Sequence, residues 1–522
     1  MREREDCKDS KGRSRVSGLG RRDLMKMGIG AGFAMTQMLD VPWTLARDST
    51  PGTVGVMTQT GTGWINDANR TSGNGPLDDT SRQLVKYVSS FSESNLTSPL
   101  IEHLGYVMVD FIACLIAGFE TEPARICARL ARSTQSDLKS TVLGYGVTTT
   151  PELAAFANTC MLRCSEFDVS IHISDIIPGI LAVGEALHST GPQILVGVTL
   201  AYEVVGALSA VVNNDPGGLW DGLYVGPATA LVVGKVLGLN EDQLANALSL
   251  SLVPHLPMFV SHVGALSMWK GCHDAESVRC GIFAALLARE GMTGPSKPFE
   301  GRAGLWDHVG QPGELRLPVA GPGGGMFVER VVIKRFPSEG STQSVLELTP
   351  AIREWTKADD IASIHVEFPF RPWQEIADPP KWDPRNRETV DHSLPYVISR
   401  ALIDGDIYLD SFSPEKIMDP AGRRLMEKIT VAPNLDFTYI GQVRLTVRTK
   451  GGGELIKETA VHHHTPMTHD EITAKFNRVC AFMQVTDKQR DRSYAEWSHL
   501  QEVRDIGEPM RALAHFGQPL PL

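Results

Sequence analysis

One lysine inside a long apolar stretch is the first side chain that could do chemistry. Lys270 lies in the sequence LSMWKGCHDAE (266–276), and most residues from Leu252 to Leu287 are small or aliphatic. An ammonium group in such surroundings is partly removed from water and needs an anionic partner. That partner could be a substrate carboxylate or a structural aspartate or glutamate, and composition alone favours the structural pair.

A second group of reactive side chains lies in a short polar run earlier in the chain. The run RCSEFDVS (163–170) is followed by HISD (172–175). These residue types suit acid–base chemistry on an anionic substrate: a base takes a proton, an acid protonates a leaving group, and cations stabilise the developing charge. No metal is required in principle. The candidates in this run are Arg163, Glu166, Asp168, Ser170, His172, Ser174 and Asp175.

Several separated stretches of the sequence resemble one enzyme family. SMWKGC (267–272), FAALLAREGMTGP (283–295), FEGRAGLWD (299–307) and DHSLPY (391–396) are similar, in the same order, to the MmgE/PrpD family, which includes 2-methylcitrate dehydratases and cis-aconitate decarboxylases. The likeness runs from about Leu84 to about Leu513. VIKRFP (332–337) also resembles a family motif whose lysine faces the cleft, which makes Lys334 a candidate carboxylate clamp.

The resemblance implies a cofactor-independent lyase that acts on a small polycarboxylate, most simply as a 2-methylcitrate dehydratase-like hydro-lyase. It assigns proton transfer to His172 and charge stabilisation to Lys270 and Lys334. Water or hydroxyl would be positioned by Glu166, Asp168 and Ser170, and the other substrate-binding candidates are Arg163, Ser174, Asp175 and His273. No cofactor and no metal are expected. The resemblance also implies a homodimer, whose interface the apolar helices from 193 to 252 could form.

Three positions depart from the family pattern in ways that affect chemistry. Glu166 and Val169 each stand where the dehydratases have an aspartate, and Gly222 stands where a histidine is common. Ser170 replaces a threonine, and the loop before His172 is shorter. Valine cannot titrate, and a misplaced acid or base can cost about a hundredfold in rate. The alternatives are therefore a decarboxylase, an epimerase, or a polycarboxylate-binding protein that has lost catalysis. A lost imidazole could be supplied by His255, His262 or His273.

The elements that position these groups are helical up to the glycine-rich stretch at 321–325. Apolar residues at Leu104, Val107 and Phe111 have the spacing of one helix face, and Thr150-Pro151-Glu152 is typical of a helix start. Residues 193–212 carry Glu203 as their one charge and are long enough to span a membrane. Their glycines and amphipathic neighbours favour a helix buried in a bundle, so no stable membrane insertion is expected.

Beyond residue 325 a period of two replaces the helical period. Ile364, Val366 and Phe368 alternate with polar residues, and a similar alternation precedes the glycines at 451–453. The predicted fold is α+β and mainly α, with a helical domain (81–324), an α/β lid domain (325–470) and C-terminal helices (471–522) that return to the first domain. The family resemblance implies the same plan, with the site in the cleft between the two domains.

Composition excludes several classes of protein. The net charge is −11, from 50 basic and 61 acidic side chains, which argues against nucleic-acid binding. Eight cysteines without a CxxC pair indicate neither a disulfide scaffold nor a zinc ribbon. The histidines at 462–464 and His469 are not expected to bind metal, because adjacent strand residues point to opposite faces.

The N-terminal segment is predicted to be a targeting sequence. GRRDLMK (20–26) resembles a twin-arginine export motif and precedes a weakly apolar run. Residues 1–46 are therefore expected to be a signal and residues 47–80 a linker. This predicts a periplasmic protein, with a cytoplasmic location as the alternative.

Overall fold

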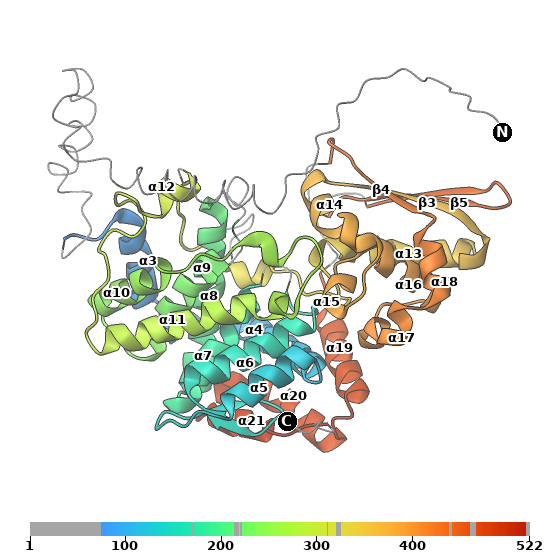
Figure 1. Cartoon of the computed structure of the whole chain (residues 1–522). Coiled ribbons are helices and arrows are strands. Elements are labelled where there is room, and N and C mark those ends of the chain that lie inside the picture. Colours follow the sequence, from blue (N-terminus) through green and yellow to red (C-terminus); the bar gives the residue numbers. More distant parts are fainter. Residues whose placement is uncertain are drawn as a thin grey trace, which may run out of the picture. The chain divides into compact units, whose positions relative to one another are not determined.

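The computed structural model describes residues 75–169, 172–212, 219, 222–310, 312–319, 325–437, 441–459 and 466–517. Contacts divide the chain into two units, 1–68 and 69–522, and the description below concerns the second. The predicted signal segment, most of the predicted linker, Ser170 and the histidines at 462–464 lie outside the described residues. The predicted fold class, α+β and mainly α, is confirmed (Figure 1).

Ten helices build the larger part of the described chain. They are α3 (Asp79–Ser90), α4 (Ser98–Gly118), α5 (Glu122–Ala131), α6 (Pro151–Cys164), α7 (Ile177–Ala186), α8 (Gly191–Val211), α9 (Gly222–Val236), α10 (Glu241–Leu252), α11 (His273–Arg289) and α12 (Leu305–Val309). The helix start predicted at Thr150 is confirmed, because its side chain accepts a hydrogen bond from the Leu153 amide. The first helix in the described residues, α3, starts at Asp79, just before the predicted domain boundary at residue 81.

The central helices of this part are packed pairwise around one core. Helix α11 packs against α9, α10 and α6, and α6 also packs against α4, α5 and α7. Among the helices that the structure describes, α4 and α8 are long and apolar enough by composition to cross a membrane, and only α8 was predicted to be so. The apolar windows of these two helices are 78% and 89% buried, so both serve as core helices in this fold.

A small sheet interrupts the helices and was not predicted. Strands β1 (Ser140–Val142) and β2 (Val147–Thr149) pair in antiparallel fashion between α5 and α6. Gly144 and Gly146 in the connecting turn have φ angles of 79° and 63°, which glycine adopts without the steric cost that other residues bear. Three-residue strands are too short to produce a readable alternation.

The smaller α/β part has its own core. Its helices are α13 (Gln343–Trp355), α14 (Phe370–Ile376), α15 (Arg387–Val390), α16 (Leu394–Asp404), α17 (Pro414–Ile417) and α18 (Pro420–Met426). Its sheet has the order β4 (Ile429–Pro433), β3 (Ile361–Phe368), β5 (Arg444–Thr449), β6 (Glu454–Glu458), with β3 and β4 parallel and the other pairs antiparallel.

The predicted alternation in β3 is confirmed, since Ile364, Val366 and Phe368 are all buried in this second core. Val328 and Ile333 pack in the core of the helical part instead, so the smaller core begins later than the predicted boundary at 325.

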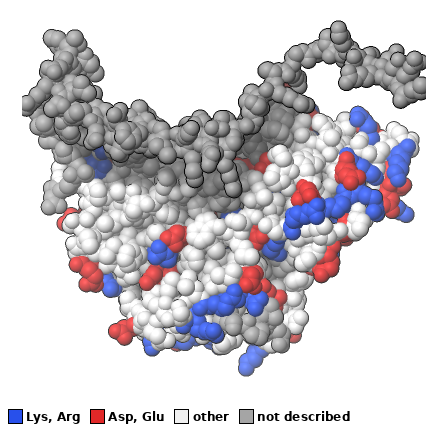
Figure 2. All heavy atoms as spheres, viewed as in Figure 1, with Lys and Arg blue, Asp and Glu red and all other residues white. Residues whose placement is uncertain are grey.

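The C-terminal helices contribute to the larger core. Helices α19 (His469–Phe482) and α20 (Asp487–Ser498) pack against α4, and α21 (Gly507–Ala512) packs against α7 and α20. Phe476 and Val479 of α19 are buried there. On the face shown in Figure 2, lysines and arginines are interspersed with aspartates and glutamates, without one continuous basic surface.

Candidate functional site

A buried arginine at the end of α6 holds several of the predicted acids together. Arg163 is 1% exposed. Its guanidinium nitrogens lie 3.3 Å from Asp168, 3.3 Å from Asp175, 3.6 Å from Asp274 and 4.0 Å from Glu166. In this structure Arg163 therefore positions protein carboxylates, and a direct contact of Arg163 with substrate stays a prediction.

Glu166 bridges the two predicted lysines. Its Oε2 atom lies 2.6 Å from the Nζ of Lys270, and its Oε1 atom lies 2.7 Å from the Nζ of Lys334. All three side chains are at most 2% exposed. Glu166 has a φ angle of +52°, a conformation that costs energy for a residue other than glycine. The structure thus brings these three predicted residues together through one shared carboxylate.

Lys270 has a second acidic partner from the smaller domain. Its Nζ donates a hydrogen bond to Asp391 Oδ2 at 3.0 Å, and the other oxygen of Asp391 accepts one from His392 Nδ1 at 2.7 Å. Asp391 lies between α15 and α16, so this ion pair joins the helical part to the smaller core. Of the two partners considered for Lys270, the structural acids are the ones observed. The Asp391–His392 pair was not predicted, although the DHSLPY motif contains it.

The charges of this cluster shift one another's pKa values. Burial by itself raises the pKa of Glu166, but Lys270 and Lys334 outweigh burial and hold it well below its usual value. Burial by itself lowers the pKa of Lys270, whereas Asp391 and Glu166 raise it above normal. Burial by itself raises the pKa of Asp391, but Lys270 and His392 together outweigh burial and lower it. Lys270, Glu166 and Asp391 are therefore charged at neutral pH.

His172 and Asp168 form the outer part of the cluster. His172 has a φ angle of +53° at the start of a short 3-10 helix (Ile173–Ile176), and its Nδ1 atom lies 3.8 Å from Asp168 Oδ2. Ser174 donates a hydrogen bond to the same oxygen at 3.2 Å. Burial would raise the pKa of Asp168, but Arg163 and Lys334 hold it below its usual value. The neighbouring Ser170 lies outside the described residues.

Asp175 differs from the other acids of the cluster. Its side chain is fully buried, and burial raises its pKa well above the usual value. The nearby charges of Asp168 and Asp274 add to this increase and outweigh the opposite effect of Arg163. A protonated Asp175 can donate a hydrogen bond, so the structure favours a positioning role for this predicted substrate ligand.

The histidines proposed as substitutes for a lost imidazole occupy two places. Ser261 Oγ lies 2.8 Å from His262 Nδ1 and 2.6 Å from His273 Nδ1, and the His262 ring is 6.3 Å from that of His392. Ser261 thus links the predicted ligand His273 to His262, and the His262 ring lies near His392 in the cluster. Burial lowers the pKa of both His262 and His273, which favours neutral imidazoles.

His255 lies near the position where the family commonly has a histidine. Its Nε2 atom is 2.8 Å from Ser277 Oγ, and a Cβ atom added to Gly222 would lie 2.6 Å from the same oxygen. A larger side chain at position 222 therefore has no room without movement of Ser277. His255 therefore contacts the same serine hydroxyl that closes the space beside Gly222.

A second buried ion pair supports Lys334 from behind and was not predicted. Lys475 of α19 lies 2.6 Å from Asp110 of α4. Its ammonium group also donates to the carbonyl oxygens of Phe167 and Lys334, at 2.8 and 3.0 Å. Lys475 thus binds the backbone next to Glu166 and at Lys334, the two residues that contact each other. Side chains that orient functional groups in this way are common in proteins.

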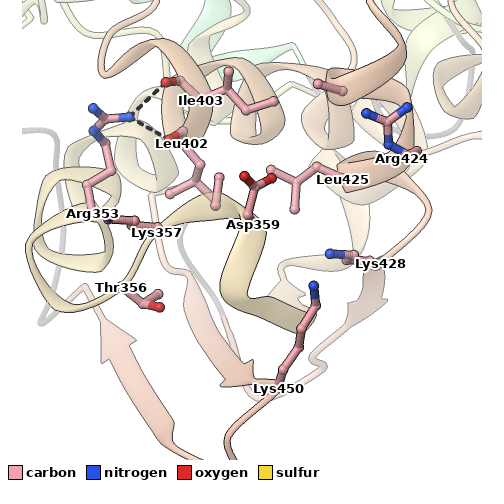
Figure 3. A pocket seen from close by; sticks show the side chains of 12 residues that line it. Arg353, Thr356, Lys357, Asp359, Leu402, Ile403, Arg424, Leu425, Lys428 and Lys450 are labelled. Atoms are coloured by element: carbon pink, nitrogen blue, oxygen red, sulfur yellow. Dashed lines mark hydrogen bonds between the residues drawn. The ribbon is translucent and has the colours of Figure 1, made fainter.

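The cluster contains three side chains that could hold a metal ion, and it is separate from the cavity on the smaller domain. Oxygen and nitrogen atoms of Glu166, Asp391 and His392 lie within 4.8 Å of one another, but the Lys270 ammonium already contacts both carboxylates. Figure 3 shows a cavity of about 600 Å³ elsewhere, lined by Arg353, Lys357, Asp359, Arg424, Lys428 and Lys450 among others. None of the predicted site residues lines that cavity.

Comparison with known proteins defines the family. The chain matches the MmgE/PrpD N-terminal domain over residues 82–318 and the MmgE/PrpD C-terminal domain over residues 336–499. The protein therefore belongs to the MmgE/PrpD family, which confirms the resemblance noted in the sequence.

Individual relatives are distant but cover most of the chain. The protein is 25% identical over 420 residues to a cis-aconitate decarboxylase of Homo sapiens, which covers 73% of this chain and 84% of the relative. It is 22% identical over 447 residues to a cis-aconitate decarboxylase of Aspergillus terreus. This match covers 78% of this chain and 90% of the relative. It is 25% identical over 429 residues to a 2-methylcitrate dehydratase of Salmonella typhi. This match covers 74% of this chain and 86% of the relative. Dehydratases and decarboxylases are both lyases.

Proposed function

We propose that the protein is a lyase that acts on a small polycarboxylate. The observation that carries the proposal is the pair of buried lysines, Lys270 and Lys334, that converge on one carboxylate. Two cations around an anion in a site removed from water form a strong recognition element for carboxylates. The lyase activities named for the relatives support the reaction class.

In this proposal a substrate carboxylate exchanges with the carboxylate of Glu166. Glu166 already occupies the space between the two ammonium groups, at 2.6 and 2.7 Å. An incoming carboxylate would take over one or both contacts, and Glu166 would then be free to hold water or a hydroxyl group. The lysines would also stabilise the negative charge that builds up next to a carboxylate during elimination.

Proton transfer is assigned to imidazoles beside the lysines. Burial and the charge of Lys270 lower the pKa of His392, so His392 is neutral and able to accept a proton. Asp391 holds its Nδ1 atom at 2.7 Å, which leaves Nε2 for the substrate. His172 is the candidate for the second transfer, with Asp168 fixing its orientation.

The finer proposal is a hydro-lyase that resembles 2-methylcitrate dehydratase and requires no cofactor. Decarboxylation and epimerisation pass through similar charge next to a carboxylate, so identification of the product distinguishes the three reactions. We also propose a homodimer and export by the twin-arginine route. Light scattering of the purified protein tests the dimer, and fractionation of the native source tests the export.

A second candidate function is a polycarboxylate-binding protein without catalysis. Val169 cannot titrate, and the space beside Gly222 is closed by Ser277 at 2.6 Å from an added Cβ atom. Two functional positions of the family pattern are therefore lost, while the lysines that would bind a carboxylate remain.

Incubation with a panel of acids tests both candidates. The panel contains 2-methylcitrate, citrate, cis-aconitate and iminodisuccinate, and each mixture is analysed for product by NMR and for ligand binding by thermal shift. The lyase proposal predicts product from at least one acid. Thermal stabilisation without any product would identify the binding protein, and neither stabilisation nor product would contradict both candidates.

A further inference from the structure

Four cysteines from three parts of the helical domain converge in one buried cluster. Cys127 lies on α5, Cys160 and Cys164 lie on α6, and Cys272 lies between the Lys270 turn and α11. The Sγ atoms of Cys160 and Cys272 are 3.0 Å apart, those of Cys160 and Cys164 are 3.8 Å apart, and those of Cys127 and Cys272 are 3.9 Å apart. None of the four side chains is more than 7% exposed.

These separations match the spacing of thiolates around one metal ion. A tetrahedral zinc site has Zn–S bonds of about 2.3 Å, which places neighbouring sulfur atoms about 3.8 Å apart. Two of the three separations agree with that value, and the third becomes compatible if Cys160 and Cys272 move apart by less than an ångström. The sulfur atoms of Cys127, Cys160 and Cys272 all lie within 4.8 Å of one another.

We propose that Cys127, Cys160 and Cys272, whose sulfur atoms lie within 4.8 Å of one another, bind one thiophilic metal ion of the zinc class. Binding replaces the thiol protons, which are released to water, by bonds from sulfur to the metal, and no electron is transferred. Sulfur ligands select such soft ions over magnesium or calcium. The absence of a CxxC pair concealed this site, because its ligands come from three separate elements.

A metal at this place would brace the candidate functional site. Cys272 is two residues after Lys270, and Cys164 directly follows Arg163 in the sequence. A Cβ atom added to Gly271 would lie 2.4 Å from Cys164 Sγ, so the Lys270 turn already contacts the end of α6 at the cysteine cluster. The metal is therefore structural, and the proposal does not depend on which reaction the protein catalyses.

Metal analysis of the untagged, full-length protein tests the site. We expect about one zinc per chain after production in zinc-supplemented medium and gel filtration with a weak chelator. The Cys272→Ser variant should lose this zinc, whereas the control Cys480→Ser should keep it, because Cys480 is equally buried but lies on α19 outside the cluster. Zinc that persists in a Cys160→Ser/Cys272→Ser double variant would place the metal elsewhere and overturn the proposal.

Two measurements on the wild-type protein keep the test independent of folding of the variants. Chelator-treated wild type loaded with Co²⁺ should show the intense near-ultraviolet absorption of cobalt–thiolate bonds and the visible bands of a tetrahedral site. No thiolate absorption would overturn the proposal. An intact mass lower by two hydrogen atoms, with a peptide linking Cys160 to Cys272, would identify a disulfide and would also overturn it.

Discussion

The ammonium group of Lys270 lies 2.6 Å from the Oε2 atom of Glu166, in a place where both side chains are 2% exposed. The second oxygen of Glu166 contacts Lys334 at 2.7 Å. Glu166 therefore occupies the position in which the proposed function requires a substrate carboxylate. The charge of the Glu166 carboxylate therefore affects both the stability of the site and its affinity for acids.

Replacement of Glu166 by glutamine should tighten the binding of a polycarboxylate. Glutamine keeps the shape of the side chain but removes the negative charge that competes for the lysines, so we expect citrate affinity to rise by about tenfold, equivalent to about 1.4 kcal/mol. Isothermal titration calorimetry measures the change. Glu203→Gln is the matched control, because Glu203 is buried on α8 and accepts hydrogen bonds from Val319 and Phe327. Weaker binding in Glu166→Gln alone would mean that Glu166 itself holds the ligand.

Loss of Lys270 should destabilise the fold. Methionine has a similar volume but leaves Glu166 and Asp391 without their shared cation, and removing one partner from a buried ion pair typically costs about 3–5 kcal/mol. Denaturant titration of Lys270→Met measures the free energy of unfolding. The double variant Lys270→Met/Asp391→Asn should recover part of this loss, since one of the stranded charges is gone. Equal stabilities of wild type and Lys270→Met would show that Lys270 is not a structural partner.

The pKa shift of Asp175 predicts a specific pH dependence. An aspartate has a pKa of about 3.9 in an unfolded chain. Burial raises the pKa of Asp175 above that value in the folded protein, so its contribution to stability is complete below pH 3.9 and is lost as the pH rises through the folded pKa.

Asp175→Asn mimics the protonated form of the side chain. The stability of this variant minus the stability of wild type should therefore be larger at pH 8 than at pH 5. Thermal unfolding at the two pH values measures this difference. Asp168→Asn is the neighbouring control of opposite sign, because the pKa of Asp168 is lowered and its charged form stabilises the fold. A gain from Asp168→Asn, or none from Asp175→Asn, would contradict the assigned shifts.

His392→Gln and His172→Gln should separate proton transfer from binding. Glutamine keeps hydrogen-bonding capacity, so the dissociation constant of the substrate should change little, while turnover falls by about 10²–10⁴-fold, the usual share of general acid–base catalysis. Rates as a function of pH, together with calorimetry, measure both effects. His365→Gln is the control, since His365 is on β3 and bonds Thr430. An unchanged rate in His172→Gln would remove His172 from the mechanism and direct the same test to His255.

Local sequence patterns predicted the fold class and the group of polar residues between Arg163 and Asp175. The helix start at Thr150 and the alternation in β3 depend on neighbouring residues, and both were found. The described polar residues of the run, Arg163, Glu166, Asp168, Ser174 and Asp175, also lie in one cluster at the end of α6 and the following short helix. The family motifs supplied Lys270 and Lys334, which contact this cluster through Glu166.

Partnerships across long sequence separations could not be predicted. Asp391 is 121 residues from Lys270, and the Phe167 carbonyl that Lys475 contacts is 308 residues away. Periodicity identifies which face of an element is buried but not which distant charge lies against it. The same reason applies to the cysteine cluster, whose members share no spacing motif, and to His255, whose approach to Gly222 depends on the packing of α9 against α11.

The most direct test of the lysine pair as the carboxylate site is the kcat/KM of Lys334→Met on the best substrate of the acid panel. Lys334 can be removed while Glu166 keeps its contact with Lys270, so the protein should remain folded. Loss of a charge-assisted hydrogen bond is worth about 1.5–3 kcal/mol, and kcat/KM should therefore fall about 10- to 100-fold. Lys450→Met, in the cavity of Figure 3, should leave kcat/KM unchanged. A normal kcat/KM in Lys334→Met together with a large loss in Lys450→Met would contradict the account and move the carboxylate site to that cavity.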